Sequence, residues 1–286
     1  MSSFDLEAWS APRRERLSQS LLSLFGDAWP EPMTAMCRHP LTASGKGMRP
    51  LLVLAAYGVV QPRGADDALV WPYALAIELI HAYSLVHDDM PCMDNDDFRR
   101  GQPTTHVLYG DGFALLVGDA LLTEAFRVAA TAKGLPPTRQ VQLIAELATS
   151  AGYHGMIGGQ AADLGAAGQV TDVGTLERLH AGKTGALLRL AVRLGAIAGG
   201  ADQTTLTQLT RYAEALGLAF QLADDVLDLE QDAKVDGPPS FPKLLGVEET
   251  RHRARSLSEQ AIAALSGLPR TEPLVALARY TVERSL

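Results

Sequence analysis

The sequence has few cysteines, few aromatic residues and no surplus of basic residues, and each shortage excludes a class of protein. Its two cysteines, Cys37 and Cys92, provide neither a disulfide framework nor the spacing of a thiol metal site. Aromatic residues make up 6% of the chain, whereas Ala, Leu and Gly recur throughout, which suits close-packed helices better than a β-sandwich. The net charge of −8 argues against nucleic-acid binding, although a local basic cluster could still bind a small phosphorylated molecule.

Long apolar runs are absent as well. Residues 51–60 are apolar but too few to cross a bilayer, and the run 186–200 is interrupted by Arg189 and Arg193. Residues 1–16 contain acidic side chains and lack the apolar core of a signal peptide. We therefore expect a cytoplasmic protein without stable membrane insertion.

Helical periodicity dominates the chain, and no alternating pattern is long enough to build a sheet. We predict helices over 13–25, 48–60, 71–89, 111–132, 139–154, 173–180, 184–198, 204–228 and 248–265. Gly- and Pro-rich segments separate several of them. No linker divides the chain into two differently composed halves, so we predict one all-α domain over residues 1–286.

The segment HDDMPCMDNDDFRRG, residues 87–101, concentrates acid at the end of an apolar helix. Asp88 and Asp89 lie at the negative C-terminal end of that helix, where each carboxylate is disfavoured by about 0.3–1 kcal/mol. Such an unfavourable position indicates a bound cation. Pro91 disturbs or ends the helix, and a reversal of the chain beyond it would bring Asp94 back towards Asp88.

A second acidic segment, FQLADDVLDLE at residues 220–230, has helical spacing. Its polar positions stand at i, i+3, i+4 and i+7, which predicts one polar stripe on an otherwise apolar helix. They are Gln221, Asp224, Asp225 and Asp228. One such stripe is most often a solvated face, but two of them in apolar helices are poorly explained that way. Mg2+ prefers oxygen ligands such as carboxylates, waters and substrate phosphates, so we predict two Mg2+-binding motifs.

Short basic groups bordered by glycine or following the first motif could bind a polyphosphate that bridges the two motifs. They are Lys46 and Arg49 in SGKGMRP, Arg99 and Arg100 after the first motif, and Lys183 and Thr184 in AGKTG. We expect AGKTG to open a helix, where free backbone N–H groups favour anions. Arg13 and Arg14 are expected to be solvated surface residues.

Together these segments resemble the trans-isoprenyl diphosphate synthases, specifically the bacterial short-chain enzymes of the farnesyl diphosphate synthase type. The likeness runs from about Leu41 to the C-terminus and comprises GKGMRP, IELIHAYSLVHDDMPCMDNDDFRRGQPTTH, GDALL, GGQAADL, HAGKTGALLR and LAFQLADDVLD. Two aspartate-rich motifs in this order, with KTG between them, make the resemblance highly specific.

The resemblance implies an all-α isoprenoid-synthase-type bundle of mostly antiparallel helices around a central cavity, assembled as a homodimer. It also implies about three Mg2+ ions, replaceable by Mn2+, that bridge the aspartate motifs to the diphosphate of an allylic substrate. Loss of that diphosphate gives an allylic carbocation, which the double bond of isopentenyl diphosphate attacks before a proton is lost. The implied partners are therefore isopentenyl and allylic diphosphates.

The resemblance also assigns roles to residues of this sequence. The implied metal ligands are Asp88, Asp89, Asp94, Asp224, Asp225 and Asp228, of which the first five, with Lys183, are the implied catalytic residues. The residues implied to contact the allylic diphosphate are Arg99, Lys183, Thr184 and Gln221. Those implied to hold isopentenyl diphosphate are Lys46, Arg49, His81 and Arg100. Asp96 and Asp97 look like surface or supporting acids.

Tyr83 and Ser84 are the residues expected to determine product length. Tyr83 lies about one and a half helical turns before Asp88, where a bulky ring could close the floor of the cavity. Bacterial farnesyl enzymes of the family pair an aromatic residue there with a two-residue insertion in the motif, matched here by Pro91-Cys92. We therefore predict a C15 product, farnesyl diphosphate, with C10 geranyl diphosphate as the alternative. A role for Tyr83 in packing alone stays open.

The sequence departs from the family after the second motif. Residues 229–242 form a shortened lid without the GKxxGxD segment, and Pro238 stands where a further lysine would align. Lys234 or Lys243 could substitute, but neither lies in the motif. Two alternatives therefore stay open: a non-catalytic subunit that modifies a true synthase, and a terpene cyclase on the same fold. The DDVLD motif and the Lys46–Arg49 pair weigh against the cyclase.

Overall fold

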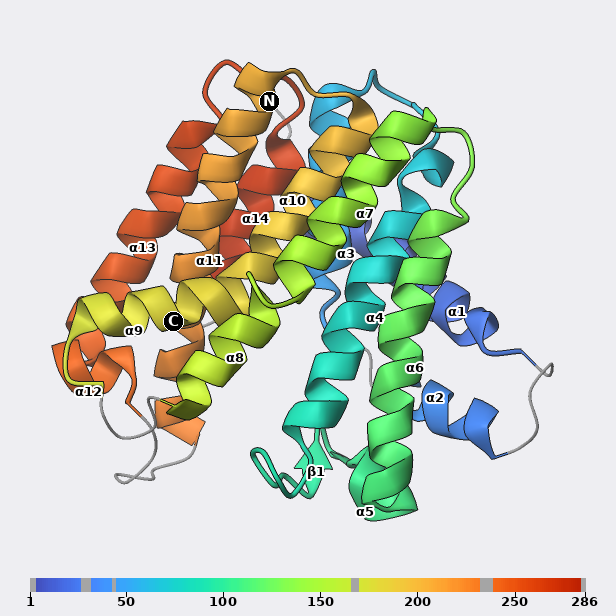
Figure 1. Ribbon diagram of the computed structural model, residues 1–286. Helices are drawn as coiled ribbons and strands as arrows, with labels where there is room; N and C mark the ends of the chain where they lie inside the picture. The colour runs from blue at the N-terminus through green and yellow to red at the C-terminus, as the bar shows by residue number, and fades with distance from the viewer. Residues whose placement is uncertain (1–3, 27–31, 43–44, 166–169, 232–238, 284–286) are drawn as a thin grey trace.

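The computed structural model describes residues 4–26, 32–42, 45–165, 170–231 and 239–283 (Figure 1). Its helices are α1 (Leu6–Leu24), α2 (Met33–Thr42), α3 (Met48–Val60), α4 (Trp71–Asp88), α5 (Thr105–Tyr109), α6 (Asp111–Ala130), α7 (Pro137–Ala151), α8 (Met156–Gly165), α9 (Val173–His180), α10 (Ala186–Gly199), α11 (Gln203–Gln231), α12 (Phe241–Leu245), α13 (Val247–Ala264) and α14 (Glu272–Glu283). The described residues also include a short turn η1 (Asp67–Leu69), a π-turn η2 (Ala181–Gly185) and an antiparallel pair, β1 (Phe98–Arg99) with β2 (Gln102–Pro103). The predicted all-α class is confirmed.

The predicted helix bounds agree best where the local signals are strong. α3 and α9 have the predicted bounds, and α9 begins after Asp172, whose carboxylate accepts a 2.9 Å hydrogen bond from the N–H of Thr175. α1 begins earlier than predicted, because Asp5 caps it through the N–H of Ala8 at 3.0 Å. The prediction missed α2, α5, α8, α12 and α14. Proline in α2 and α12, and a glycine pair in α8, weaken the helical signal there.

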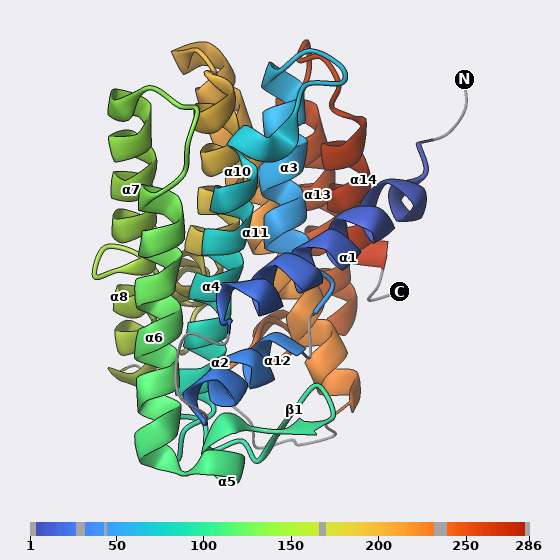
Figure 2. The ribbon, with the colours of Figure 1, turned by 90° about the vertical axis from the view of Figure 1, so that its right-hand side faces the viewer.

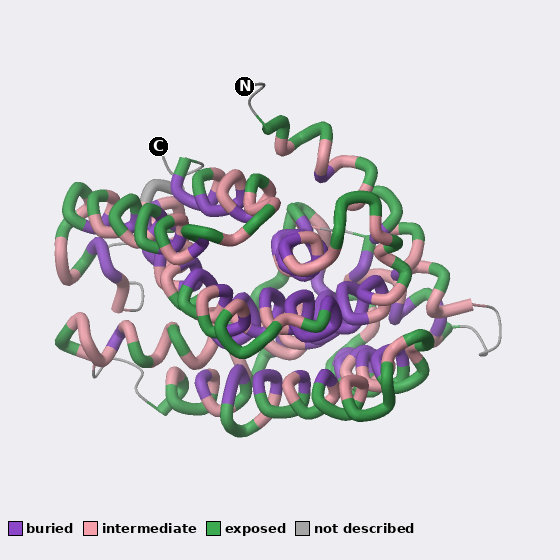
Figure 3. The backbone as a smooth tube through the Cα atoms, turned by 90° about the horizontal axis from the view of Figure 1, so that it is seen from above, coloured by how far each residue is buried: buried purple, intermediate pink, exposed green. Residues whose placement is uncertain are grey.

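The residues of α3, α4 and α10 are mostly buried. Figure 3 shows the buried residues gathered in the middle of the bundle. Gly195 lets α10 lie against α3, because a Cβ at that position would come within 2.1 Å of the Val53 carbonyl oxygen. One apolar cluster includes buried residues from Leu17 in α1 to Ala278 in α14. This packing determines how the helix ends that carry the predicted motifs are placed relative to one another.

Both acidic motifs lie at the same end of the bundle. The C-terminal ends of α4 and α11 point towards the end at which the β1–β2 hairpin, α5 and α12 gather, at the bottom of Figure 1. α1 and α2 lie across the long helices, as Figure 2 shows. None of the described helices is both long and apolar enough to cross a membrane.

Candidate active site

The first acidic motif begins where α4 ends. The helix stops at Asp88, and the N–H of Asp94 donates a 2.8 Å hydrogen bond to the Asp88 carbonyl oxygen. Asn95 completes the reversal with a φ of 56°. The predicted return of the chain is therefore confirmed. Burial raises the pKa of Asp88, the ammonium of Lys183 lowers it, and the charge of Asp94 raises it further.

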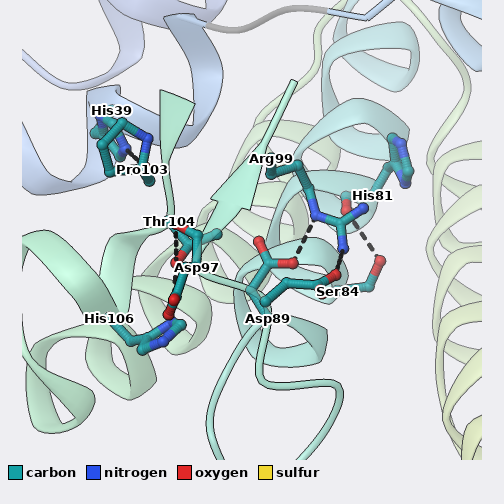
Figure 4. A network of polar contacts seen from close by, with 10 residues as sticks. His39, His81, Ser84, Asp89, Asp97, Arg99, Pro103, Thr104 and His106 are labelled. Carbon is teal, nitrogen blue, oxygen red and sulfur yellow. Dashed lines mark hydrogen bonds and ion pairs between the residues drawn. The ribbon is translucent and has the colours of Figure 1, made fainter. Parts of the chain in front are cut away.

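The second aspartate of this motif, Asp89, is buried and paired with Arg99 (Figure 4). Arg99 Nε donates to Asp89 Oδ1 at 2.5 Å, and its Nη2 donates to Asp96 Oδ2 at 2.9 Å. Burial raises the pKa of Asp89 to about 6, although the guanidinium of Arg99 opposes the shift. Two carboxylates therefore orient Arg99, and Asp96 acts as a supporting acid.

The second acidic motif lies on α11, where helical spacing places its polar side chains on one side of the helix, as predicted. Asp224 lines a groove that is also lined by residues of α1, α3 and α14, and Asp228 is exposed. Asp225 is 8% exposed, and both of its oxygens accept hydrogen bonds. The donors are Gln221 Nε2 at 2.7 Å and the backbone N–H of Phe241 at 2.9 Å. Within this polar stripe, Asp225 is thus turned towards α12.

Oxygen donors that suit Mg2+ are present on both motifs. The turn brings Asp94 back to Asp88, and Asp224 and Asp228 share a helix face at i and i+4. Among the described residues, no three His, Cys, Asp or Glu side chains are grouped closely enough to hold a metal by themselves. The aspartates are therefore not a preformed metal cluster. Pairs of carboxylates still fit Mg2+, because waters and substrate phosphates commonly complete its coordination.

A groove of about 810 Å³ opens beside the second motif. It is lined by Lys46, Arg49, His81 and Arg100, and also by Thr184 and Asp224. Gly45 leaves room for Arg100, since a Cβ at Gly45 would come within 2.6 Å of the guanidinium. Burial and the neighbouring arginines lower the pKa of His81 well below its usual range, so the imidazole is neutral near pH 7. The fold therefore assembles basic residues from separate segments in one groove.

Two further residues of the groove were not predicted from the sequence. Arg14, expected to be solvated, lines the groove and donates to Glu7 Oε1 at 2.6 Å. Glu78 lies one turn before His81 and is buried; burial raises its pKa, whereas the charge of Arg49 lowers it. A lone acid in the apolar part of a helix is the signal that could have identified Glu78.

Lys183 and Thr184 lie in a π-turn. Helical backbone runs from α9 through η2 into α10, so no helix begins at AGKTG. The predicted anion-binding helix start is therefore wrong. Thr184 lines the groove, and Lys183 Nζ lies 3.3 Å from Asp163 Oδ2. π-Turns inside helices occur frequently at functional sites.

Tyr83 is 4% exposed and lies one turn before His87, beside α6. The two rings meet edge to face at a centroid distance of 5.9 Å, and a Cβ at Gly118 would come within 1.9 Å of His87 Nε2. The Tyr83 hydroxyl is buried and has no hydrogen-bond partner among the described residues. Ser84 donates its hydroxyl to the His81 carbonyl oxygen at 2.9 Å. Their role in product length stays a prediction.

Part of the shortened lid, including Lys234 and Pro238, lies outside the described residues. The described chain resumes before α12, where the N–H of Phe241 binds Asp225. Lys243 is exposed on α12. The second motif is therefore tied to the segment that follows the lid.

A family model for polyprenyl synthetases matches residues 30–241, which include both acidic motifs and the π-turn. The chain belongs to the polyprenyl synthetase family. It is 42% identical over 275 residues to the farnesyl diphosphate synthase of Escherichia coli, covering 89% of this chain and 90% of that protein. It is 38% identical over 296 residues to geranylgeranyl pyrophosphate synthase 7 of Arabidopsis thaliana, covering 98% of this chain and 84% of that protein. The apo structure of an FPP/GFPP synthase from Zymomonas mobilis matches with a TM-score of 0.86 at 39% identity, covering 96% of this chain and 99% of that chain.

These similarities confirm the resemblance that the acidic motifs indicated, and the all-α isoprenoid-synthase fold. This polyprenyl synthetase is a short-chain trans-prenyltransferase. The names of its relatives differ in product length, so membership of the family does not determine the product of this chain.

Proposed function

We propose that this polyprenyl synthetase condenses isopentenyl diphosphate with dimethylallyl or geranyl diphosphate to give farnesyl diphosphate. The observation that carries the proposal is the groove in which four predicted isopentenyl-site residues meet one predicted allylic-site residue and one predicted metal ligand. They are Lys46, Arg49, His81 and Arg100, with Thr184 and Asp224. A groove of this charge and composition suits two diphosphates, because each needs cationic donors and the allylic one also needs bound metal.

Each diphosphate has its own set of donors in this proposal. Isopentenyl diphosphate takes the charges of Lys46, Arg49 and Arg100, and neutral His81 donates one N–H to it. The residues assigned to the allylic diphosphate are Lys183, Thr184, Arg99 and Gln221. As the allylic C–O bond breaks, these donors stabilise the negative charge that develops on the leaving diphosphate.

The metal assignment follows from where the aspartates lie: Asp94 returns to Asp88, and Asp224 lines the groove with Asp228 on the same helix face. The residues that would hold Mg2+ are Asp88, Asp94, Asp224 and Asp228. The bound ions, about three in number, would neutralise the diphosphate, and Mn2+ would replace them. Asp89 and Asp225 act through protein contacts instead, since one orients Arg99 and the other accepts hydrogen bonds from Gln221 and Phe241.

Incubation of the protein with Mg2+, isopentenyl diphosphate and dimethylallyl or geranyl diphosphate tests the proposed reaction. We expect a C15 diphosphate that is absent from a boiled control and from samples treated with EDTA. Failure to form any C10 or C15 diphosphate would reject the proposal. A volatile hydrocarbon formed from farnesyl diphosphate alone would indicate a terpene cyclase.

Arg49→Gln is expected to raise the KM for isopentenyl diphosphate by about 10- to 100-fold, because a charge-assisted hydrogen bond is worth about 1.5–3 kcal/mol. The KM for the allylic substrate should stay within about twofold, since Arg49 lies on the other set of donors. Steady-state kinetics with each substrate varied in turn measures both values. Equal increases in the two KM values would contradict the division of the groove.

The shortened lid favours one alternative function, a subunit that modifies another prenyl synthase. The lid lacks the lysines that the family's pattern places there. This alternative would be supported if the protein co-purified with a second prenyl synthase and prenyltransferase activity appeared only when both proteins were present.

We further propose that the protein is a homodimer that pairs through α5 and α6. An apolar surface there comprises Val107, Leu108, Phe113, Leu115 and Leu116, each 45–53% exposed. Another side of α6 packs on α4, whereas these side chains are about half exposed to solvent. Large apolar side chains exposed together on neighbouring helices are typical of an association site. We also propose that residues 1–286 form one cytoplasmic domain, supported by the shared apolar cluster and by two free cysteines.

Leu116→Glu is expected to convert the dimer to monomers, because it places a charge within the apolar surface. Size-exclusion chromatography with light scattering measures the change in mass. Val141→Glu, at an isolated exposed position on α7, is the control and should leave the mass unchanged. A wild-type protein that is monomeric at micromolar concentration would contradict the proposal.

A further inference from the structure

The motif GGQAADL, residues 158–164, carries none of the groups assigned above to substrates or metals. It forms most of α8, which packs directly against the π-turn η2 that contains Lys183 and Thr184. Figure 1 shows α8 beside the end of α9, from which η2 continues. Helix α8 makes two kinds of contact with that turn.

The first contact joins backbone to backbone at Gly159. A Cβ at Gly159 would lie 2.4 Å from the nitrogen of Lys183 and 2.5 Å from the carbonyl carbon of Gly182. In return, a Cβ at Gly182 would lie 3.2 Å from the Gly159 Cα. Backbone atoms cannot rotate away as the end of a side chain can. Glycine at position 159 therefore sets how closely η2 approaches α8.

The other side of the π-turn has a similar contact with α11. A Cβ at Gly217 would lie 3.1 Å from the Cα of Gly185. Gly217 and Asp224 are seven residues apart and share one face of α11. The turn is thus held between α8 and the helix that carries the second acidic motif, which fixes Lys183 and Thr184 relative to Asp224.

The second contact from α8 is an ion pair. Asp163 follows Gly159 by four residues, so the two lie on the same face of the helix. Asp163 Oδ2 lies 3.3 Å from Lys183 Nζ, with the side chains 47% and 28% exposed. An ion pair this exposed contributes little to the free energy of folding. Its main effect is therefore to orient the Lys183 ammonium.

We propose that α8 positions the active-site lysine, with Gly159 determining the depth of the π-turn and Asp163 directing the Lys183 ammonium. The inference rests on the proposed allylic role of Lys183 and Thr184. Gly159 and Asp163 are positioning residues, because they act on the allylic diphosphate through the turn.

Gly159→Ala tests the backbone contact. We expect the KM for the allylic substrate to rise, or kcat to fall, by about 10- to 100-fold, because Lys183 and Thr184 are displaced. The KM for isopentenyl diphosphate should change by less than about twofold, since its donors lie on other elements. Gly165→Ala is the matched control: it lies at the end of the same helix, where a Cβ would meet nothing within 4 Å. Control kinetics should equal those of the wild type.

Asp163→Asn and Asp163→Glu test the ion pair and do not depend on the folding of Gly159→Ala. The Asn variant keeps the shape but loses the charge, so we expect the allylic KM to rise by about three- to tenfold. The Glu variant keeps the charge and should recover most of the affinity. If Asp163 only supported the fold, the allylic KM would not depend on whether the substituted side chain carries a charge.

The results separate failure of the inference from failure of the proposed function. Absence of product with the wild-type protein would reject the function itself. An active wild type with unchanged allylic kinetics in both Gly159→Ala and Asp163→Asn would overturn the inference. A lower allylic KM in Asp163→Asn would also overturn it, because Asp163 would then compete with the diphosphate for Lys183.

Discussion

Asp224→Asn is expected to lower kcat by about 100- to 1000-fold, because it removes a negative oxygen donor from the groove where charge must be balanced in the transition state. Asp225→Asn is expected to lower kcat by only about tenfold but to lower the melting temperature, since Asp225 accepts hydrogen bonds from Gln221 and Phe241. An asparagine at 225 would present an NH2 group to one of these donors and leave it unsatisfied, which costs about 1–3 kcal/mol.

The Asp224→Asn and Asp225→Asn variants therefore serve as controls for each other. Measuring kcat over a range of Mg2+ concentrations, together with thermal unfolding, distinguishes their roles. Asp224→Asn should require more Mg2+ for half-maximal rate, whereas Asp225→Asn should keep the wild-type requirement. Equal losses of kcat and equal shifts in the Mg2+ requirement would show that both carboxylates bind metal.

Tyr83→Ala is expected to shift the main product from C15 to longer diphosphates. Tyr83 lies about 7.5 Å along α4 from Asp88, at 1.5 Å per residue, so removal of its ring would create space at the depth where the growing chain is proposed to end. The Tyr83 side chain is 4% exposed, and truncation of a buried aromatic ring costs about 3–5 kcal/mol of stability. Product analysis at a temperature well below the melting point of the variant therefore gives the clearest reading.

Tyr83→Phe is the matched control for product length. It keeps the ring and removes a hydroxyl that is buried without a hydrogen-bond partner among the described residues. We therefore expect a C15 product and a melting temperature equal to or above that of the wild type, because an unpaired buried polar group is unfavourable. An unchanged C15 product from Tyr83→Ala would leave the ring with a packing role alone.

The chemistry of the site could be predicted from local patterns. The acidic motifs are contiguous in sequence, and helical spacing together with Pro91 was enough to expect that Asp94 returns to Asp88. The cationic residues are short segments next to glycine, and the structure gathers Lys46, Arg49 and Arg100 in one groove as expected. The motifs themselves depend on neighbours within a few residues, which is why they can be found in the sequence, whereas the fold brings their separate segments into one groove.

Two local predictions failed because packing overrode them. AGKTG contains glycines that normally break or begin a helix, yet η2 carries helical backbone between α9 and α10. Close contacts with Gly159 in α8 and Gly217 in α11 hold that turn, and neither contact could be seen from the segment itself. Arg14 was read as solvated, but α1 crosses the bundle and places it in the groove.

The sequence by itself determined the helical class, the family resemblance and the residue types at the site, since these follow from composition, periodicity and contiguous motifs. The tertiary structure decided which partners bind the second carboxylate of each adjacent pair. Asp89 is bound by Arg99 from the hairpin, and Asp225 by the backbone of Phe241 beyond the lid. Neighbouring residues on a helix differ by about 100° in direction, so the role of each depends on which distant segment packs against it.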